Sequence, residues 1–388
     1  MAINKRDIPE MKIFRKLFSR EAEVVVRSPA RVNIIGEHTD YNDGFVFPAA
    51  INRSVRVAAA VRTDRQCRLY SQHFDTTVEF PLEELIKTRD WTDYIKGTLK
   101  ELLSREFPVG GFDAVIGGDL PVASGLSSSA ALELAVSACC QALFSFEVDP
   151  WEDIKLARRA ENQFVGVNCG IMDQFSIRMG RQGHGLFLDC RSLEYEEVPI
   201  PADELVFVIA DSRVERGLGN TEYHARQKQC ERGRLFFTSL NKSIRSLRDV
   251  SEDMLIVNRA KLDPVVYRRC RHVITENLRV CKAVNALKQP DMMLFGEMMN
   301  ISHESCKNDF EVSCRELDIL VELARKVPGV LGARMTGAGF GGCTINLVSR
   351  NRVEEFQQKV GSLYNNATGL EADFIVTGPE DGVEFRRF

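Results

Sequence analysis

The sequence predicts a protein of two lobes that combines strands with helices, and three observations lead to this prediction. The chain has 388 residues, more than the length at which a single hydrophobic core normally stops growing. Short segments rich in β-branched residues open the chain, and apolar residues at helical spacing dominate its carboxyl half. We therefore expect two lobes with a cleft between them.

The first predicted elements are strands. β-Branched residues mark them at positions 23–27, 54–61, 67–71 and 112–116. The last of these strands ends in Gly117 and Gly118, and a loop of small residues follows at 121–129. A helix is expected after this loop, over about 127–144.

Three later helices are predicted from their starts. Each start pairs a capping side chain with a proline or a glutamate in the first turn: Asp149 with Pro150 and Glu152, Asp263 with Pro264, and Ser313 with Glu316. In the first of them, the glutamate is expected to reach back to the cap. This helix runs toward Phe164, which places Glu161 near its carboxyl end.

Two more strands, at 330–335 and 343–348, flank a cluster of glycines and predict a glycine-rich hairpin. The sequence shows no repeats and no low-complexity linker, so the domain boundary rests on the change of pattern alone. We place it near residue 200, with domains at 1–200 and 201–388.

The composition excludes several classes of protein. The 51 basic and 55 acidic residues show no long single-sign blocks, so we expect no nucleic-acid partner. No apolar run approaches the roughly 20 residues of a membrane-spanning helix, and the basic amino end lacks the pattern of an address peptide. The 11 dispersed cysteines include no C-x-x-C pair, which argues against zinc and for a reducing compartment. We expect a cytoplasmic monomer.

The run from Arg31 to Gly44, RVNIIGEHTDYNDG, concentrates a cation, carboxylates and an imidazole between glycines. A polar turn between two strands is the simple alternative. A sugar, however, offers hydroxyls that both donate and accept, so a pocket that distinguishes epimers needs such groups in fixed positions. The density of polar side chains favours a sugar site.

A second segment, PVASGLSSSA at 121–130, lies between a strand and a helix. Small residues let the backbone approach an anion, and the start of a helix directs free amides at it, which favours phosphate binding. A serine-capped helix start is the simple alternative. The P-loop pattern and the protein-kinase patterns are absent from the sequence.

A third segment, RMTGAGFGGC at 334–343, formally contains G-x-G-x-x-G, but no ribose-binding acid on a following helix supports a dinucleotide site. Its crowded glycines indicate close backbone approach to a ligand.

A fourth segment, at 161–163 and 169–174, contains Asp173. An isolated aspartate is more often a turn residue than a catalyst. Asp173 becomes a candidate catalytic residue only because the other motifs are present in the same sequence.

These segments together resemble the family of galactokinase, homoserine kinase, mevalonate kinase and phosphomevalonate kinase. The run 31–44 looks like the galactokinase signature, residues 125–130 like the family's phosphate loop, and 334–343 like its third motif. The similarity extends from about Ser28 through Cys343. It implies an α+β, two-lobed fold with an amino-terminal domain like ribosomal protein S5 domain 2, a ferredoxin-like carboxyl domain and an active site in the cleft.

The implied activity is ATP- and Mg²⁺-dependent phosphorylation of the anomeric hydroxyl of galactose, which yields galactose 1-phosphate. By position, Asp173 is similar to the family's catalytic aspartate and Arg31 to its neighbouring arginine. A guanidinium beside the carboxylate keeps it ionised and lowers the cost of charge developing on the sugar oxygen.

The resemblance assigns the remaining site residues. The magnesium ligands are Ser129 and Glu161. The residues implied to bind the sugar are Glu37, His38, Asp40, Gly170 and Tyr223. Those implied to bind the nucleotide are Gly125, Ser127, Ser128, Ser129, Trp91, Gly337 and Gly339.

The chain departs from the family's pattern before Tyr223, where Asp211 and Glu215 replace an asparagine and a basic residue. Arg213 and Arg216 are candidate substitutes. Two alternatives therefore stay open: a related sugar kinase acting on N-acetylgalactosamine, galacturonate or arabinose, and a non-catalytic galactose sensor. A serine hydrolase is discarded because a nucleophile elbow is missing from the sequence.

Overall fold

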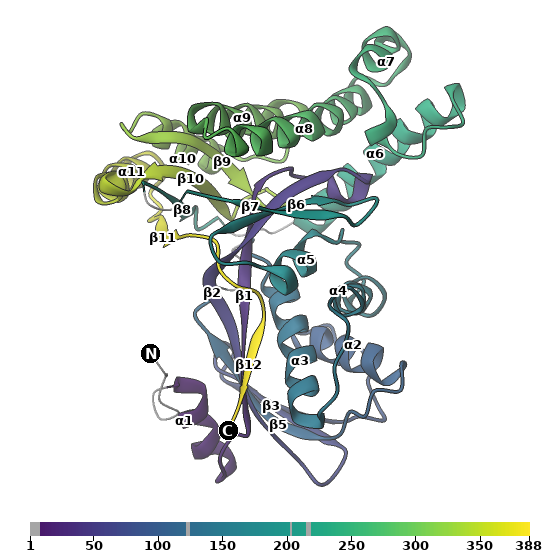
Figure 1. Ribbon diagram of the computed structural model, residues 1–388, viewed down its shortest axis with the longest axis vertical. Coiled ribbons are helices and arrows are strands. Elements are labelled where there is room, and N and C mark those ends of the chain that lie inside the picture. Colours follow the sequence, from purple (N-terminus) through teal and green to yellow (C-terminus); the bar gives the residue numbers. More distant parts are fainter. Residues whose placement is uncertain (1–7, 122–124, 202–203, 215–218) are drawn as a thin grey trace.

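The computed structural model describes residues 8–121, 125–201, 204–214 and 219–388, with the backbone alone at 219 and 220. Within these residues the strands form two sheets: one of eight strands, which extends from the lower end of the molecule in Figure 1 to its middle, and one of four strands in the upper part. Helices cover both sheets.

The first sheet has the order β12-β1-β2-β5-β3-β4, with β6 on β2 and β7 on β6. Neighbouring strands are antiparallel except β3 and β5, which are parallel. The strands are β1 Val24–Ile35, β2 Phe45–Val61, β3 Gln66–Ser71, β4 Thr76–Pro81, β5 Phe112–Gly118, β6 His184–Asp189, β7 Tyr195–Pro199 and β12 Glu384–Arg387.

The four predicted strands of this sheet are confirmed, but β1 and β2 are longer than predicted. Residues Arg31 to Ile35 of the polar run stay in β1, where Arg31 pairs with Ala50 and Asn33 with Pro48. Only residues 36–44 form the connection. The strand continues because its polar residues are buried and satisfied by tertiary partners rather than by water.

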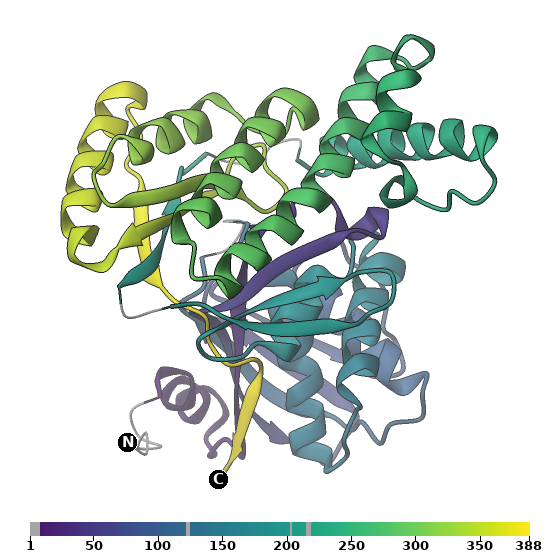
Figure 2. The same cartoon turned by 45° about the horizontal axis from the view of Figure 1, so that its top comes forward.

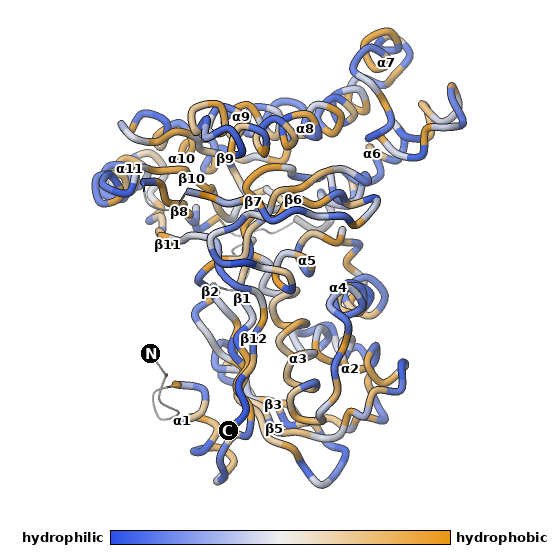
Figure 3. Tube along the Cα trace, in the orientation of Figure 1, coloured by the Kyte–Doolittle hydropathy of each residue, from blue (hydrophilic) through white to orange (hydrophobic). Residues whose placement is uncertain are grey.

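Helices α2 to α5 cover one face of the first sheet, and α1 covers the other. Their bounds are α1 Pro9–Phe18, α2 Thr92–Leu103, α3 Ser128–Phe144, α4 Pro150–Arg159 and α5 Met172–Met179, with a π-helical turn Ala160–Val165 after α4. The predicted helix at 127–144 is confirmed as α3, which is buried on most sides; its trace is mainly orange and pale in Figure 3, whereas blue predominates on α4.

The prediction for the start of α4 is confirmed at Asp149 and wrong at Glu152. Asp149 caps α4 by accepting from the amides of Trp151 and Glu152, but the carboxylate of Glu152 accepts from Arg105 and Arg159 instead of reaching back. Because two guanidinium partners hold that carboxylate, the predicted capping box is wrong.

The other two starts lie in the second half of the chain. Asp263 caps α8 as predicted, accepting from two first-turn amides. Helix α10 begins at Arg315, with Cys314 at its N-cap, because the Ser313 hydroxyl donates to Asp318 instead of capping the helix.

The second sheet has the order β11-β8-β10-β9 and is antiparallel throughout. Its strands are β8 Leu205–Asp211, β9 Val330–Thr336, β10 Cys343–Ser349 and β11 Asp373–Thr377. Strands β9 and β10 confirm the predicted hairpin. The helices are α6 Gly219–Leu240, α7 Glu252–Val257, α8 Pro264–Lys288, α9 Met292–Ser305, α10 Arg315–Arg325 and α11 Val353–Thr368. With α6 to α10 between β8 and β9, and α11 between β10 and β11, this βαββαβ arrangement is the ferredoxin-like fold that the family resemblance implied.

The two sheets share a hydrophobic core. One buried cluster joins Val32 of β1 and Phe47 of β2 to Ile209 of β8, Ile345 of β10 and Val280 of α8. The final strand β12 also returns from the second sheet to pair with β1, as the yellow segment in Figure 2 shows. In the described part of the chain, none of the helices combines the length and apolar character that crossing a membrane requires.

Candidate active site

An ion pair joins β1 to α5 at the centre of the candidate site. Arg31 donates from Nε to Oδ1 of Asp173 at 2.7 Å and from Nη2 to Oδ2 at 2.9 Å. The Asp173 side chain is 27% exposed, whereas that of Arg31 is 5% exposed. The guanidinium is therefore buried behind the carboxylate, and the carboxylate faces open space.

The serine-rich loop is fastened to the same ion pair. Arg31 Nη1 donates to the carbonyl oxygen of Gly125 at 2.9 Å, and the Ser127 hydroxyl donates to Asp173. Burial alone lowers the pKa of Arg31, but the neighbouring carboxylates, Asp173 first, raise it above its ordinary value. The guanidinium stays charged and orients both the carboxylate and the loop.

Helix α3 begins without a side-chain cap. Ser127, at the N-cap, has φ 62° and makes no cap hydrogen bond, because its hydroxyl is used by Asp173. The predicted alternative of a serine-capped helix is therefore wrong. The amides of the first turn, where Ser128 and Ser129 lie, point out of a helix start that carries partial positive charge. This is the geometry that binds phosphate groups.

Ser129 and Glu161 also meet, although they lie 32 residues apart in the sequence. The carboxylate of Glu161 is hydrogen-bonded to the Ser129 side chain, and its Oε2 accepts from Gln174 Nε2 at 2.7 Å and from Cys169 Sγ at 3.3 Å. Burial, and then the charge of Asp173, raises the pKa of Glu161. A buried carboxylate in this position favours a nearby cation.

Asp40 and Gly170 lie against each other, and the charge of Asp173 acts on Asp40. Asp40 begins the short 3₁₀ turn Asp40–Asn42, and a Cβ atom on Gly170 would overlap its carboxylate. Burial, and then the charge of Asp173, raises the pKa of Asp40 to about 6. Position 170 must therefore be glycine for this carboxylate to lie where it does.

His38, Tyr41 and Tyr223 form an aromatic wall beside Asp40. The ring of His38 lies 5.6 Å from that of Tyr223, and the ring of Tyr41 lies 5.5 Å from it. Burial lowers the pKa of His38 to about 3, so the imidazole is neutral. Its Nε2 lies 3.2 Å from the carbonyl oxygen of Ala338, which requires the proton on Nε2 and leaves Nδ1 to accept from the Tyr41 hydroxyl at 2.9 Å.

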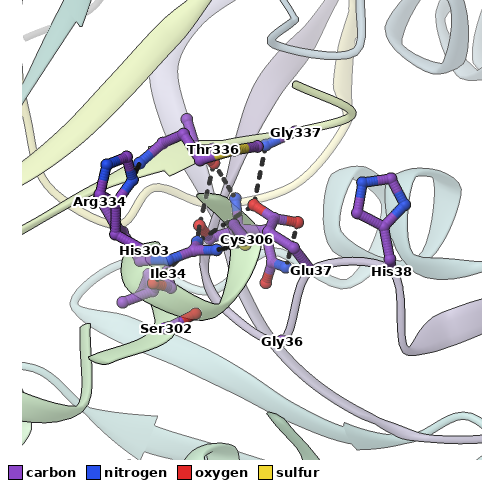
Figure 4. A network of polar contacts seen from close by, with 12 residues as sticks. Ile34, Gly36, Glu37, His38, Ser302, His303, Cys306, Arg334, Thr336 and Gly337 are labelled. Atoms are coloured by element: carbon purple, nitrogen blue, oxygen red, sulfur yellow. Dashed lines mark hydrogen bonds and ion pairs between the residues drawn. The ribbon is translucent and has the colours of Figure 1, made fainter. Parts of the chain in front are cut away.

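Glu37 lies in a buried network between the two sheets (Figure 4). Its carboxylate accepts from Arg334 Nη1 at 3.1 Å, from the amide of Gly337 at 2.8 Å and from Asn33 Nδ2 at 2.8 Å. Figure 4 shows Glu37 pointing toward Arg334 and Gly337, while the neighbouring His38 points away from them. These contacts join the polar run to the glycine-rich hairpin, and a sugar contact by Glu37 stays a prediction.

The other predicted nucleotide residues make contacts within the protein. Trp91 stacks on Phe74 with ring centroids 5.9 Å apart. A Cβ on Gly339 would overlap the carbonyl oxygen of Val312, so the glycine lets the hairpin pack against that segment. Contacts of Trp91, Gly337 and Gly339 with nucleotide stay predictions.

The unusual residues before Tyr223 are only partly visible. Asp211 ends β8, and its carboxylate accepts from the amide of Arg213 at 2.9 Å. The exposed side chain of Arg213 pairs with Asp373 at 3.1 Å. Glu215 and Arg216 lie outside the described residues.

Comparisons with known proteins agree with this geometry. Residues 12–61 match the galactokinase galactose-binding signature, residues 93–181 the GHMP kinases N terminal domain, and residues 283–366 the GHMP kinases C terminal domain. Galactokinases from Roseiflexus sp. and Clostridium perfringens are 42% and 43% identical to the chain, over about 95% of each protein. The chain belongs to the galactokinase family.

Solved structures of relatives support the assignment of the fold. Lactococcus lactis galactokinase in complex with galactose is 38% identical, with a TM-score of 0.93 over 96% of this chain and 98% of that chain. A mevalonate kinase with 18% identity and a TM-score of 0.64 shares the fold. As a sugar kinase of this family, the protein uses ATP as phosphoryl donor.

Sequence reasoning missed several residues that the structure brings to the candidate site. Ser127 was expected only to hold phosphate, yet it also donates to Asp173. Tyr41 was not singled out, and neither were Glu133 and Gln174, which lie behind Glu161. Glu133 is the one charged residue of the apolar helix α3, and this is the sequence signal that marks it as unusual.

Proposed function

We propose that this protein transfers the γ-phosphoryl group of ATP to the anomeric hydroxyl of galactose and releases galactose 1-phosphate and ADP. The carrying observation is the Arg31–Asp173 ion pair, which is bonded to the loop that opens α3. It puts a carboxylate acceptor next to a helix start suited to phosphate.

Asp173 has room for one more donor. A carboxylate has about four acceptor positions, and among the described residues three are used, by Arg31 Nε, Arg31 Nη2 and the Ser127 hydroxyl. The remaining position accepts the anomeric hydroxyl. As the sugar oxygen bonds to the γ-phosphorus and the bond to ADP breaks, the hydroxyl proton passes to Asp173 and Arg31 compensates the local charge.

The sugar is held on the side of Asp40. The space beside Asp173 is bordered by Asp40, by the backbone of Gly170 and by Tyr223 and His38 of the aromatic wall. These groups offer the sugar hydrogen-bond acceptors and ring faces. With Nε2 donating to Ala338 and Nδ1 accepting from Tyr41, the neutral His38 positions Tyr41. We infer that Glu37 supports this wall from behind.

Magnesium fits the residues that were predicted to hold it. Ser129 and Glu161 supply hard oxygen donors, and Oε1 of the neighbouring Glu133 is buried without a hydrogen-bond partner among the described residues. Burial, and then the charge of Glu161, raises the pKa of Glu133 well above its usual range, and a bound cation would offset this effect. Among the described residues no group of three or more His, Cys, Asp and Glu side chains has metal-binding geometry, so the remaining ligands would be phosphate oxygens and water. When bound, Mg²⁺ supplies charge neutralisation of the phosphate oxygens.

We also propose that the protein acts in the cytoplasm as a monomer.

A coupled ADP-release assay with Mg·ATP and a panel of sugars tests the proposal. Galactose is expected to be turned over with the highest kcat/KM. Turnover of N-acetylgalactosamine, galacturonate or arabinose without turnover of galactose would make the protein a related sugar kinase. Galactose binding without turnover of any sugar would make it a sensor.

Replacing Asp173 by asparagine separates binding from chemistry. Asp173→Asn keeps the shape of the side chain and one acceptor oxygen but removes the proton acceptor, so kcat is expected to fall by roughly 10²–10⁴. The Kd for galactose, measured by isothermal titration calorimetry, is expected to change by less than about tenfold, because the amide oxygen can still accept from the sugar hydroxyl. Near-normal turnover would overturn the role assigned to Asp173.

A further inference from the structure

A second buried carboxylate lies behind Glu161. Glu133, on α3, accepts at Oε2 from Gln174 Nε2 at 3.2 Å. The same Gln174 nitrogen donates to Oε2 of Glu161 at 2.7 Å. The side-chain amide of Gln174, from α5, therefore bridges two carboxylates that belong to different elements.

This arrangement is unfavourable for stability by itself. Glu133 and Gln174 are fully buried, and within the described part of the chain Oε1 of each has no hydrogen-bond partner. An apolar pair of similar volume would be at least as stable, because a buried carboxylate with an unsatisfied oxygen carries a desolvation penalty. A role outside packing explains why such side chains occupy the interface between α3 and α5.

The bridge determines how Glu161 is oriented. The amide has two hydrogens, and the two carboxylates use both. Glu161 lies in the π-helical turn Ala160–Val165, where the backbone ladder departs from the regular α-helix, so side-chain contacts have to fix its carboxylate. Gln174 and Cys169 both donate to Oε2. These two hydrogen bonds fix the plane of the Glu161 carboxylate, which lies beside Ser129.

We propose that Glu133 and Gln174 are positioning residues that orient the Glu161 carboxylate for the magnesium ion of Mg·ATP. The inference rests on the proposed function, because it assigns Glu161 to the metal. Glu133 holds the Gln174 amide in place, and Gln174 holds Glu161. Outer hydrogen-bond partners of metal ligands typically change metal affinity by about 10- to 100-fold when they are removed.

The primary measurement is the affinity of the enzyme with ATP for Mn²⁺. It is obtained from the electron paramagnetic resonance signal of the Mn²⁺ that stays free. Gln174→Met and Glu133→Met keep the volume but remove the bridge, and each is expected to weaken Mn²⁺ binding about tenfold. Glu133→Gln keeps an acceptor oxygen for Gln174 and is expected to stay within about threefold of wild type. The Kd for galactose, measured without metal, is expected to stay unchanged in all three variants.

The controls distinguish positioning from general damage. Gln141→Met removes a different buried glutamine, which lies on α3 and donates to Ser137 and Asp153, and this variant is expected to leave Mn²⁺ affinity unchanged. Thermal unfolding reports on folding. If Glu133→Met does not fold, Gln174→Asn replaces it, since the shorter amide cannot span both carboxylates and is also expected to weaken Mn²⁺ binding.

Two results would overturn the inference. One is wild-type Mn²⁺ affinity in the folded Met variants, and the other is an equal loss in Glu133→Gln and Glu133→Met. Failure of the proposed function looks different, because the wild-type protein would then neither bind Mn²⁺ with ATP nor phosphorylate galactose.

Discussion

At the scale of single residues, the site depends on close contacts that leave no room for substitution. Gly170 is the clearest case, because its missing side chain is the space that the Asp40 carboxylate occupies. His38 shows the same dependence on neighbours, since burial keeps its imidazole neutral and its two nitrogens are both used. Residue identity at these positions follows from what lies beside them.

Gly170→Ala is expected to displace Asp40 and weaken galactose binding. Loss of a hydrogen bond to a charged acceptor is worth about 1.5–3 kcal/mol, or roughly 10- to 150-fold in Kd. Titration calorimetry with galactose measures the change. The matched control is Gly378→Ala, where a Cβ atom meets nothing within 4 Å and affinity should not change. Equal affinities of the Gly170 variant and wild type would contradict the placement of Asp40.

The raised pKa of Asp40 predicts a dependence of stability on pH. Because burial raises this pKa from 3.8 to about 6, the carboxyl prefers to be protonated in the folded protein. Its stabilising contribution is present below about pH 4 and is lost as the pH rises through about 6. Asp40→Asn is therefore expected to raise the melting temperature at pH 8 and to have little effect at pH 4.

Differential scanning fluorimetry at both pH values checks this prediction. The control is Glu371→Gln, an exposed carboxylate far from the site in sequence, which should shift the melting temperature equally at both values. A pH-independent effect of Asp40→Asn would show that burial does not disfavour its charge.

At the scale of elements, helix starts determine where the functional side chains lie. The start of α3 leaves its amides uncapped and points them at the site, whereas the start of α4 is capped by Asp149. Helix α4 continues into the π-helical turn that carries Glu161. One helix start is thus organised for a ligand and the other for stability.

Asp149→Ala is expected to destabilise the protein by about 1 kcal/mol, the usual loss when an N-cap side chain is removed. Asp149 accepts from the amides of Trp151 at 2.9 Å and Glu152 at 3.2 Å, and Asp149→Asn retains such an acceptor. Urea denaturation should therefore rank the asparagine variant near wild type and the alanine variant below it. The reverse ranking would exclude a capping role.

At the scale of the whole molecule, a buried ion pair links the two sheets. Glu37 follows β1 and Arg334 lies in β9, about 300 positions away, and their side chains are 2% and 0% exposed. The shared hydrophobic cluster lies between the same sheets. The lobes are therefore held in one relative position by apolar packing and by a polar network that ends at the site.

Arg334→Met is expected to destabilise the protein by about 3–5 kcal/mol, because it leaves the Glu37 carboxylate buried without its cation. The double variant Glu37→Gln with Arg334→Met removes the uncompensated charge and is expected to recover part of this loss. Chemical denaturation of the two variants and wild type gives the comparison. A double variant less stable than the Arg334 variant would argue that the ion pair is not the source of the effect.

The sequence by itself determined the local structure and the identity of the motifs. Strands, the α3 helix, the caps at Asp149 and Asp263 and the glycine-rich hairpin follow from spacing and backbone chemistry over a few residues, and the order of the motifs indicated the family. Where local patterns failed, another partner had taken the capping group: Arg105 from α2's carboxyl side and Arg159 of the same helix at Glu152, and Asp318 of α10 itself at Ser313.

Only the tertiary structure decided which buried polar groups meet. Arg31 and Asp173 are 142 positions apart, and the bridge from Glu133 through Gln174 to Glu161 joins three separate elements. Periodicity records that a residue is buried, but it does not record its partner. The contacts that orient a charge inside a protein depend on distances between distant segments, and those distances exist only after folding.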